Sequence, residues 1–90
     1  MARKEMVPRV IDGDTFMTGS RKNPIRLANV NTPEKGSRGE GTATQALRAL
    51  VLGQAVSVET VARDMYGRSV ARVRVCNRSV NAAMRRKGYK

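Results

Sequence analysis

Residues 68–75 carry the pattern that most restricts the fold of this chain. Apolar and charged side chains alternate there, in the order Ala71, Arg72, Val73, Arg74 and Val75. A period of two places the apolar side chains on one face of a β-strand and the arginines on the other. The pattern predicts a strand with one apolar face. Its two arginines either extend a basic groove or simply face water.

Four earlier strands are predicted from short stretches of strand-forming residues that turn signals separate. They lie at residues 6–11, at 15–18, at 25–30 and around Val56 and Val58. The turn residues Asp12-Gly13-Asp14 follow the first stretch, and Asn31-Thr32-Pro33 closes the third.

Two helices are predicted, one before the last two strands and one after them. Thr42 and Gln45 form a capping box ahead of an apolar helix face, and Gly53 is placed to end that helix. Ser79 caps a short final helix that Gly88 ends. Three strands, a helix, two strands and a helix predict a mainly β (α+β) fold. This is a five-stranded, partly open OB barrel with one helix between strands three and four.

The charge of the chain is strongly unbalanced. Among 90 residues, 18 Lys and Arg face seven Asp and Glu, which gives a net charge of +11. This favours a polyanionic partner, nucleic acid before an anionic membrane. The length of 90 residues fits one domain, residues 1–90, expected to be a monomer.

Cysteine and histidine usage restricts the metal chemistry. With no His and one Cys, the chain excludes an ordinary zinc site, so any metal must be a hard ion bound by oxygen. The valines near Cys76 predict a small buried thiol. No stretch approaches the ~20 apolar residues of a membrane span, and the first residues lack the pattern of a signal peptide.

Three of the seven acids fall in two motifs at strand ends, Asp12-Gly13-Asp14-Thr15 and Asn31-Thr32-Pro33-Glu34. Taken alone, the first motif is better explained as a turn. Arg26 and Arg68 taken singly are better explained as a solvated strand face, and Tyr66 as a half-buried aromatic. Together they gain weight, because phosphodiester hydrolysis needs guanidinium groups, a metal-binding acid and a carboxylate that activates water.

The order of five motifs resembles that of staphylococcal nuclease domains, over about residues 7–89. The motifs are Val10-Ile11-Asp12-Gly13-Asp14-Thr15, Ile25-Arg26-Leu27, Asn31-Thr32-Pro33-Glu34, Asp64-Met65-Tyr66-Gly67-Arg68 and Val80-Asn81. The resemblance implies an OB barrel and a calcium-dependent nuclease that cuts DNA and RNA to leave a 3′-phosphate. It also implies a secreted or periplasmic protein of bacterial type.

The resemblance assigns a single Ca²⁺ site to the two motifs at strand ends. It implies that Asp14 binds the ion directly, that Asp12 stands one layer behind it, and that the backbone carbonyl of Thr32 is a further ligand. Asn31 stands where active members have an Asp ligand. An amide oxygen can bind Ca²⁺ but brings no charge, so we expect a weakened site.

The resemblance also assigns catalytic roles. Glu34 is implied to be the general base or to position the water, and Arg26 and Arg68 to clamp the phosphate. The Tyr66 hydroxyl is implied to contact a substrate phosphate. Met65 replaces a lysine that helps to hold a terminal phosphate.

Three alternatives stay open. The chain is a nuclease, a nucleic-acid-binding OB module that has lost catalysis, or a scaffold for protein contacts. Asn31 favours the second alternative. In the family, a strand-like segment with base-stacking tyrosines and then a C-terminal helix follow the position of Tyr89. Both are missing here, which also favours the second alternative. The basic stretch Arg85-Arg86-Lys87, with Lys90, either grips a nucleic-acid backbone or forms a solvated helix end.

Overall fold

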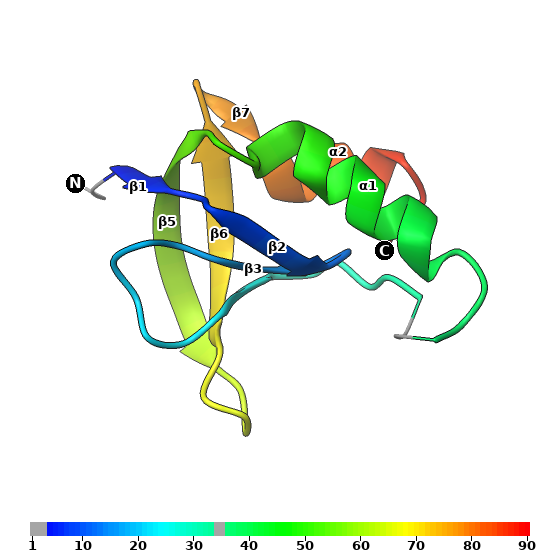
Figure 1. Ribbon diagram of the computed structural model, residues 1–90, viewed down its shortest axis with the longest axis horizontal. Coiled ribbons are helices and arrows are strands. Elements are labelled where there is room, and N and C mark those ends of the chain that lie inside the picture. The colour runs from blue at the N-terminus through cyan, green and yellow to red at the C-terminus, as the bar shows by residue number, and fades with distance from the viewer. Residues whose placement is uncertain (1–3, 34–35) are drawn as a thin grey trace.

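The computed structural model describes residues 4–33 and 36–90, and it shows a strongly curled sheet with two helices packed against it (Figure 1). Within these residues six strands run in the order β1-β5-β6-β4-β3-β2, and a seventh, β7, pairs with β6. The elements are β1 (Lys4–Met6), β2 (Arg9–Asp12), β3 (Thr15–Met17), β4 (Ile25–Leu27), α1 (Glu40–Val51), β5 (Ala55–Arg63), β6 (Ser69–Val75), β7 (Arg78–Ser79) and α2 (Val80–Arg86). This half-barrel confirms the predicted OB-like α+β class.

The N-terminal strand explains how the sheet curls. The single strand predicted at residues 6–11 is wrong, because the chain breaks at Val7-Pro8 into β1 and β2. Proline has no amide hydrogen and disfavours a continuous ladder. β1 pairs with β5, whereas β2 pairs with β3, so two consecutive strands occupy opposite ends of the sheet order. Val7 holds the junction, since its backbone exchanges hydrogen bonds with Gln54 at 3.2 Å and Gly53 at 2.9 Å.

The predicted fifth strand is confirmed as β6, and it lies at the centre of the sheet. Ala71 and Val73 are fully buried, whereas Arg72 and Arg74 are exposed. β6 pairs antiparallel with β5 and parallel with β4. The strand predicted at 25–30 is wrong beyond Leu27, because the chain turns at Asn29, where φ is 60°.

The first helix begins earlier than its predicted cap. α1 starts at Glu40, and Thr42 lies inside it, so the capping box is wrong. Gly39 caps the helix instead, with φ of 89°, a left-handed conformation that glycine adopts without steric cost. The other predicted helix signals are confirmed. Gly53 follows α1 with φ of 74°, and the Ser79 hydroxyl accepts a hydrogen bond from the Ala82 amide at 3.1 Å.

The core lies between the concave face of the sheet and the helices. Its fully buried side chains are Val7, Phe16, Ile25, Leu27, Val30, Leu47, Val51, Val56, Ala71, Val73 and Met84. The prediction of a buried Cys76 is wrong, because the chain leaves the sheet there in a tight turn, with φ of 48°, and exposes the thiol. In the described part of the chain, no helix has the length and apolar character needed to cross a bilayer.

Candidate active site

Most of the residues that sequence analysis singled out meet in one cleft of about 340 Å³. Its lining residues are Asp12, Asp14, Arg26, Asn31, Thr32, Pro33 and Arg68. They come from the end of β2 and the turn after it, from β4, from the segment that follows β4 and from the residue directly before β6. The sheet register brings them together, because β4 pairs with β3 on one side and with β6 on the other.

Two carboxylates stand side by side at this cleft. The Asp12 Oδ1 atom accepts a hydrogen bond from the Asp14 amide at 3.2 Å, and Thr15 donates its hydroxyl to Asp14 Oδ1 at 2.8 Å. The Asp14 side chain is 14% exposed. Burial raises the pKa of Asp14, and the neighbouring Asp12 carboxyl adds to this, while Thr15 and Arg26 oppose it. Two acids crowded in this way favour a cation nearby.

Arg26 crosses the cleft from β4. Its guanidinium donates to the carbonyl oxygens of Leu27 and Val30, each at 3.2 Å. Its Nη2 atom also lies 3.4 Å from Asp14 Oδ2 and 3.4 Å from Asn31 Oδ1. These contacts hold the guanidinium in one orientation, with both a carboxylate and an amide oxygen beside it.

Arg68 is held by two residues to which sequence analysis gave no role. Asp64 accepts hydrogen bonds from the Arg68 amide at 2.9 Å and from its Nε atom. The Arg68 Nη1 atom lies 3.5 Å from the Thr15 hydroxyl, which itself donates to Asp14. Thr15 therefore links the arginine to the carboxylates. Asp64 and Thr15 both stand inside motifs that sequence analysis had singled out. The four-residue spacing of Asp64 and Arg68 was the signal that could have predicted their ion pair.

Tyr66 lies at the rim of this site rather than in it. Its side chain is 77% exposed, so the half-buried alternative is wrong. The Arg68 guanidinium carbon lies 5.5 Å from the ring centroid, within the range of a cation–π contact. Tyr66 does not line the cleft formed by the described residues. Met65, beside it, is 87% exposed.

Gly13 lets the acidic turn reach its position. A methyl group at Gly13 would lie 2.6 Å from the Ala43 Cβ atom on α1 and 3.0 Å from Thr32 Cβ. The Asp12–Asp14 turn can therefore pack against both neighbours only with glycine at its centre. Sequence analysis had interpreted Gly13 as a turn residue alone.

The oxygen atoms at the cleft are of the kind that a hard cation binds. They belong to the Asp12 and Asp14 carboxylates and the Asn31 amide, and carboxylate and amide oxygens fit Ca²⁺ or Mg²⁺. Thr32, whose backbone carbonyl was predicted as a further ligand, also lines the cleft. Across residues 4–33 and 36–90, no group of three or more His, Cys, Asp or Glu side chains gathers to hold a metal. The set therefore offers at most two negative charges. Glu34 lies outside the described residues, directly after Pro33 at the cleft.

Comparisons with known proteins find relatives of this chain. Residues 24–90 match the family model described as staphylococcal nuclease homologue. An uncharacterized endonuclease of Escherichia coli O157:H7 is 39% identical over 69 residues, which cover 74% of this chain and 45% of that protein. Protein ParB of Escherichia coli is 37% identical over 93 residues, covering 91% of this chain and 52% of that protein.

A third relative, micrococcal nuclease of Shigella flexneri, is 35% identical over 66 residues, covering 71% of this chain and 38% of that protein. The chain thus spans about half the length, or less, of the curated relatives it matches. The family match includes Arg26, Asn31, Thr32 and Arg68, and it begins after the Asp12–Asp14 turn.

Proposed function

The chain belongs to the staphylococcal nuclease family, and we propose that it hydrolyses phosphodiester bonds of DNA or RNA with Ca²⁺ as its cofactor. One observation carries the proposal. Two carboxylates and two arginines, each held by other groups, meet in a single cleft on a strongly basic chain. This set can bind a phosphate and neutralise the charge that develops on it.

The two arginines would bind the phosphate that is cut. Arg26 and Arg68 present planar forks that match phosphate oxygens, and charge builds on those oxygens in the transition state. Hydrogen bonds from Arg26 to Val30 and from Arg68 to Asp64 already orient them. Little freedom is then lost when the substrate binds, which favours catalysis.

Asp14, the Asn31 amide and the Thr32 carbonyl would hold the ion, with Asp12 behind Asp14. When bound, calcium supplies positive charge beside the phosphoryl oxygens and the attacking water. Asp14 is the one charged group in this direct set, because Asn31 is neutral. We therefore propose that the ion binds more weakly than it would with a second carboxylate.

Glu34 is proposed to orient or deprotonate the attacking water. Its place in the motif Asn31-Thr32-Pro33-Glu34, directly after a residue of the cleft, supports this role. The oxygen of water forms a bond to phosphorus, and the bond to the 5′ oxygen breaks. The proton from water passes to Glu34 and is then released to solvent, the 5′ oxygen takes a proton from solvent and leaves as a hydroxyl, and the product keeps a 3′-phosphate.

A second candidate function is nucleic-acid binding without catalysis. The Arg26 Nη2 atom lies 3.4 Å from both Asp14 Oδ2 and Asn31 Oδ1, so a guanidinium already compensates the charge that would bind a metal. The Asn31 side chain is neutral, which also favours binding without catalysis. Under this alternative the cleft holds a phosphate, and no bond is cut.

The experiment that separates these functions is hydrolysis of an end-labelled single-stranded oligonucleotide with millimolar Ca²⁺ or with chelator. We expect calcium-dependent cleavage that Glu34→Gln abolishes and that Glu40→Gln, a matched change on α1, leaves intact. Glu34→Gln should retain its affinity for the oligonucleotide. Absence of cleavage with binding retained would establish the non-catalytic function instead.

A further inference from the structure

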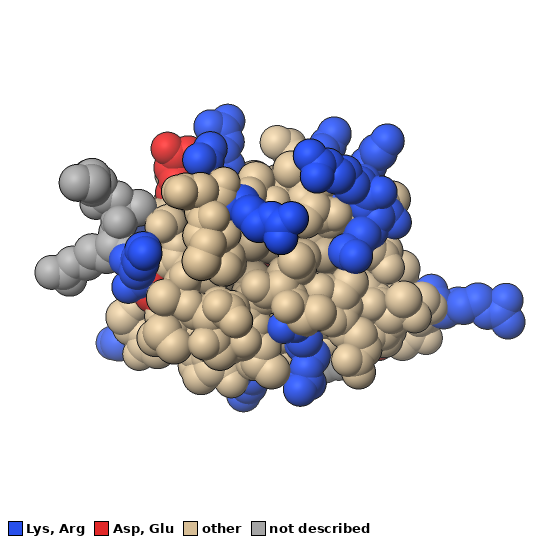
Figure 2. All heavy atoms as spheres, turned by 90° about the horizontal axis from the view of Figure 1, so that it is seen from above, with Lys and Arg blue, Asp and Glu red and all other residues tan. Residues whose placement is uncertain are grey.

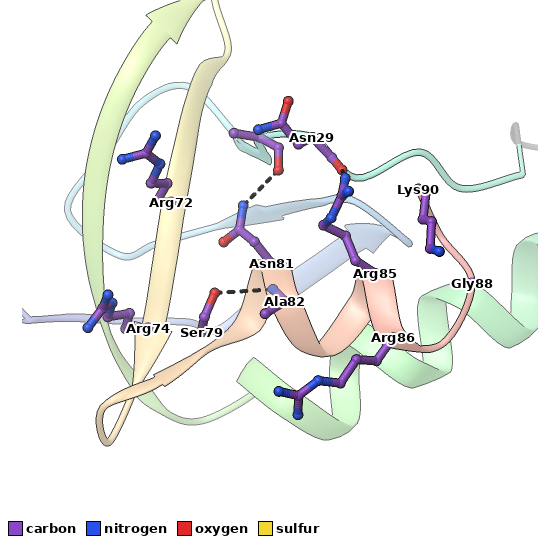
Figure 3. Close-up of a pocket in the computed structure, with 11 residues that line it drawn as sticks. Asn29, Arg72, Arg74, Ser79, Asn81, Ala82, Arg85, Arg86, Gly88 and Lys90 are labelled. Atoms are coloured by element: carbon purple, nitrogen blue, oxygen red, sulfur yellow. Dashed lines mark hydrogen bonds between the residues drawn. The ribbon is translucent and has the colours of Figure 1, made fainter.

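A second and larger groove, of about 600 Å³, lies between β6 and α2. Figure 3 shows its lining residues, with arginines on the strand at one side and further cations on and beyond the helix at the other. The cations are Arg72, Arg74, Arg85, Arg86 and Lys90. Among the described residues that line it, there is no acidic and no aromatic side chain. The groove thus offers charge and hydrogen-bonding groups, but no surface for stacking a base.

The floor of the groove is fixed by Asn81, a residue of the last sequence motif. Its Oδ1 atom accepts a hydrogen bond from the Val73 amide at 2.8 Å, and its Nδ2 atom donates to Ala28 at 2.9 Å and Ala71 at 3.1 Å. Asn81 is 8% exposed, so these bonds are shielded from water. They tie the helix, the strand and the segment after β4 together, and the groove needs little reorganisation to receive a ligand.

Three arginines of the groove, Arg72, Arg74 and Arg86, are not held by a strong ion pair within the described chain. Arg72 pairs with Glu59 at 3.4 Å, but both side chains are about two-thirds exposed, at 68% and 66%, so the pair is weak. Arg85 donates to the Asn29 carbonyl at 2.6 Å. Arg74 and Arg86 form no ion pair with any residue that the structure describes. Figure 2 shows Lys and Arg side chains spread around the face seen from above, with a group at its upper right, and Asp and Glu toward its left.

The groove and the candidate active site share one wall, the segment 28–33. Ala28 and Asn29 line the groove, whereas residues 31–33 line the cleft. Arg85 holds the Asn29 carbonyl from the groove side, and Arg26 holds the Val30 carbonyl from the cleft side. A flexible polyanion that occupies the cleft can therefore continue over this wall into the groove.

We propose that the groove between β6 and α2 binds the backbone phosphates of a single-stranded nucleic acid, beside the phosphate held in the cleft. The identity of the ligand rests on the proposed function. The cations of the groove match the charge of a phosphate backbone, and the absence of aromatic residues from its described lining makes the contact independent of sequence. The groove adds affinity and takes no part in bond cleavage.

The test reverses the two cations that form no ion pair and spares Arg85, which supports the shared wall. Arg74→Glu/Arg86→Glu is compared with Arg9→Glu/Arg48→Glu, which changes the net charge equally at exposed positions outside both sites. Binding of a fluorescent oligothymidylate of about 16 nucleotides, the upper end of the site size of one OB fold, is measured by anisotropy in chelator. We expect the groove variant to lose about tenfold or more in affinity and the control less than about threefold, as two phosphate contacts are lost.

The salt dependence gives a second measure. Loss of two phosphate contacts should reduce the slope of log K against log salt by about 1.4 for a single strand. Equal losses of affinity in the two variants would overturn the proposal, because only the net charge would then matter. If circular dichroism shows that the groove variant is misfolded, the proposal is tested on the wild-type protein by NMR instead. Titration of oligonucleotide must then shift the arginine side-chain NMR signals of Arg74 and Arg86, and shifts confined to Arg26 and Arg68 would overturn the groove.

These outcomes are independent of catalysis. Binding is read in chelator, where no cleavage is needed. A protein that cuts nothing but loses affinity through Arg74 and Arg86 retains the groove and loses the proposed function. A protein that cuts normally and shows no groove effect retains the proposed function and loses the groove.

Discussion

In the cleft, Arg26 and Arg68 are each fixed by a carboxylate and by further hydrogen bonds, and their side chains are 23% and 27% exposed. In the groove on the other side of the 28–33 segment, Arg74 and Arg86 are exposed and form no ion pair within the described chain. Both regions therefore use arginine, but its guanidinium is held in place in the cleft and exposed to solvent in the groove.

The difference separates two tasks of a guanidinium. An arginine held in one orientation can stabilise the charge that develops on a reacting phosphate, because its donors are in place before that charge develops. An arginine free in solvent supplies charge alone, which a lysine supplies as well. Binding to a polyanion tolerates such freedom, because it depends mainly on the number of phosphates neutralised.

The largest effect that could break this comparison is expected from replacing arginine with lysine in each region. Arg68→Lys keeps the charge but removes the fork that contacts Asp64 and Thr15, so kcat/KM for oligonucleotide cleavage should fall about 100-fold. Arg86→Lys keeps the charge in the groove, and we expect less than a twofold change in affinity or cleavage. The measurement is steady-state cleavage together with anisotropy in chelator.

Equal sensitivity of the two positions would remove the distinction between an oriented and a free arginine. Urea unfolding of both variants serves as the control, because Arg68→Lys could act by loosening the turn that begins at Asp64. A cleavage defect that persists while unfolding is unchanged assigns the effect to the site.

A smaller effect is expected when the cleft receives a further charge. Asn31→Asp places a carboxylate beside Asp14, and we expect calcium affinity to rise about tenfold, which is about 1.4 kcal/mol. Titration calorimetry with Ca²⁺ measures this directly. Asn23→Asp, in the exposed loop before β4, is the matched control and should leave the affinity unchanged. No gain with Asn31→Asp would exclude Asn31 from the metal site.

The smallest effect belongs to a third arginine, which is held as firmly as those of the cleft but lies away from both sites. Glu5 accepts hydrogen bonds from Arg21 at 2.8 and 2.9 Å, and from Thr18 and Ser20. The hydrogen bond from Arg21 is the main cause that lowers the pKa of Glu5 below its ordinary value of 4.5, although burial opposes it. Because the folded-state pKa is the lower one, this stabilisation is present above pH 4.5 and is lost as the pH falls through the folded-state value.

Glu5→Gln should therefore cost about 1 kcal/mol in the free energy of unfolding at neutral pH, and less at a pH of about 3. Urea unfolding at both pH values measures the difference. Cleavage and oligonucleotide binding should not change. A defect in either would mean that a firmly held arginine matters wherever it lies, and the contrast between cleft and groove would lose its basis.

The local rules of sequence predicted the fold class and several of its elements. The alternation around Ala71 and Val73 determined β6, and Ser79 determined the start of α2, because both signals act over a few residues. The start of α1 was missed because Gly39, not Thr42, turns the chain into the helix. The split of the first strand at Pro8 was missed because it depends on pairing with β5, about 50 residues away.

For the site, the motifs identified the residues that line the cleft but not the way in which they are connected. The contact between Thr15 and Arg68, which links the arginine to Asp14, spans 53 positions, and no local pattern reveals it. The sequence left two alternatives for Arg72 and Arg74, and a basic groove was one of them. Its floor depends on the contact between Asn81 and Ala28, which also spans 53 positions.

The break at Val7-Pro8 also sets an order of events for the folding chain. β2, β3 and β4 are neighbours in sequence and can pair early, since closing short loops costs little entropy. β1 must wait for β5, whose partner residues are Ala55 to Ser57, so this end of the curled sheet stays unpaired until those residues have been synthesised. On the ribosome, the acidic turn after β2 would thus form well before Arg68 reaches it, and the cleft would be completed only once Arg68 has been added.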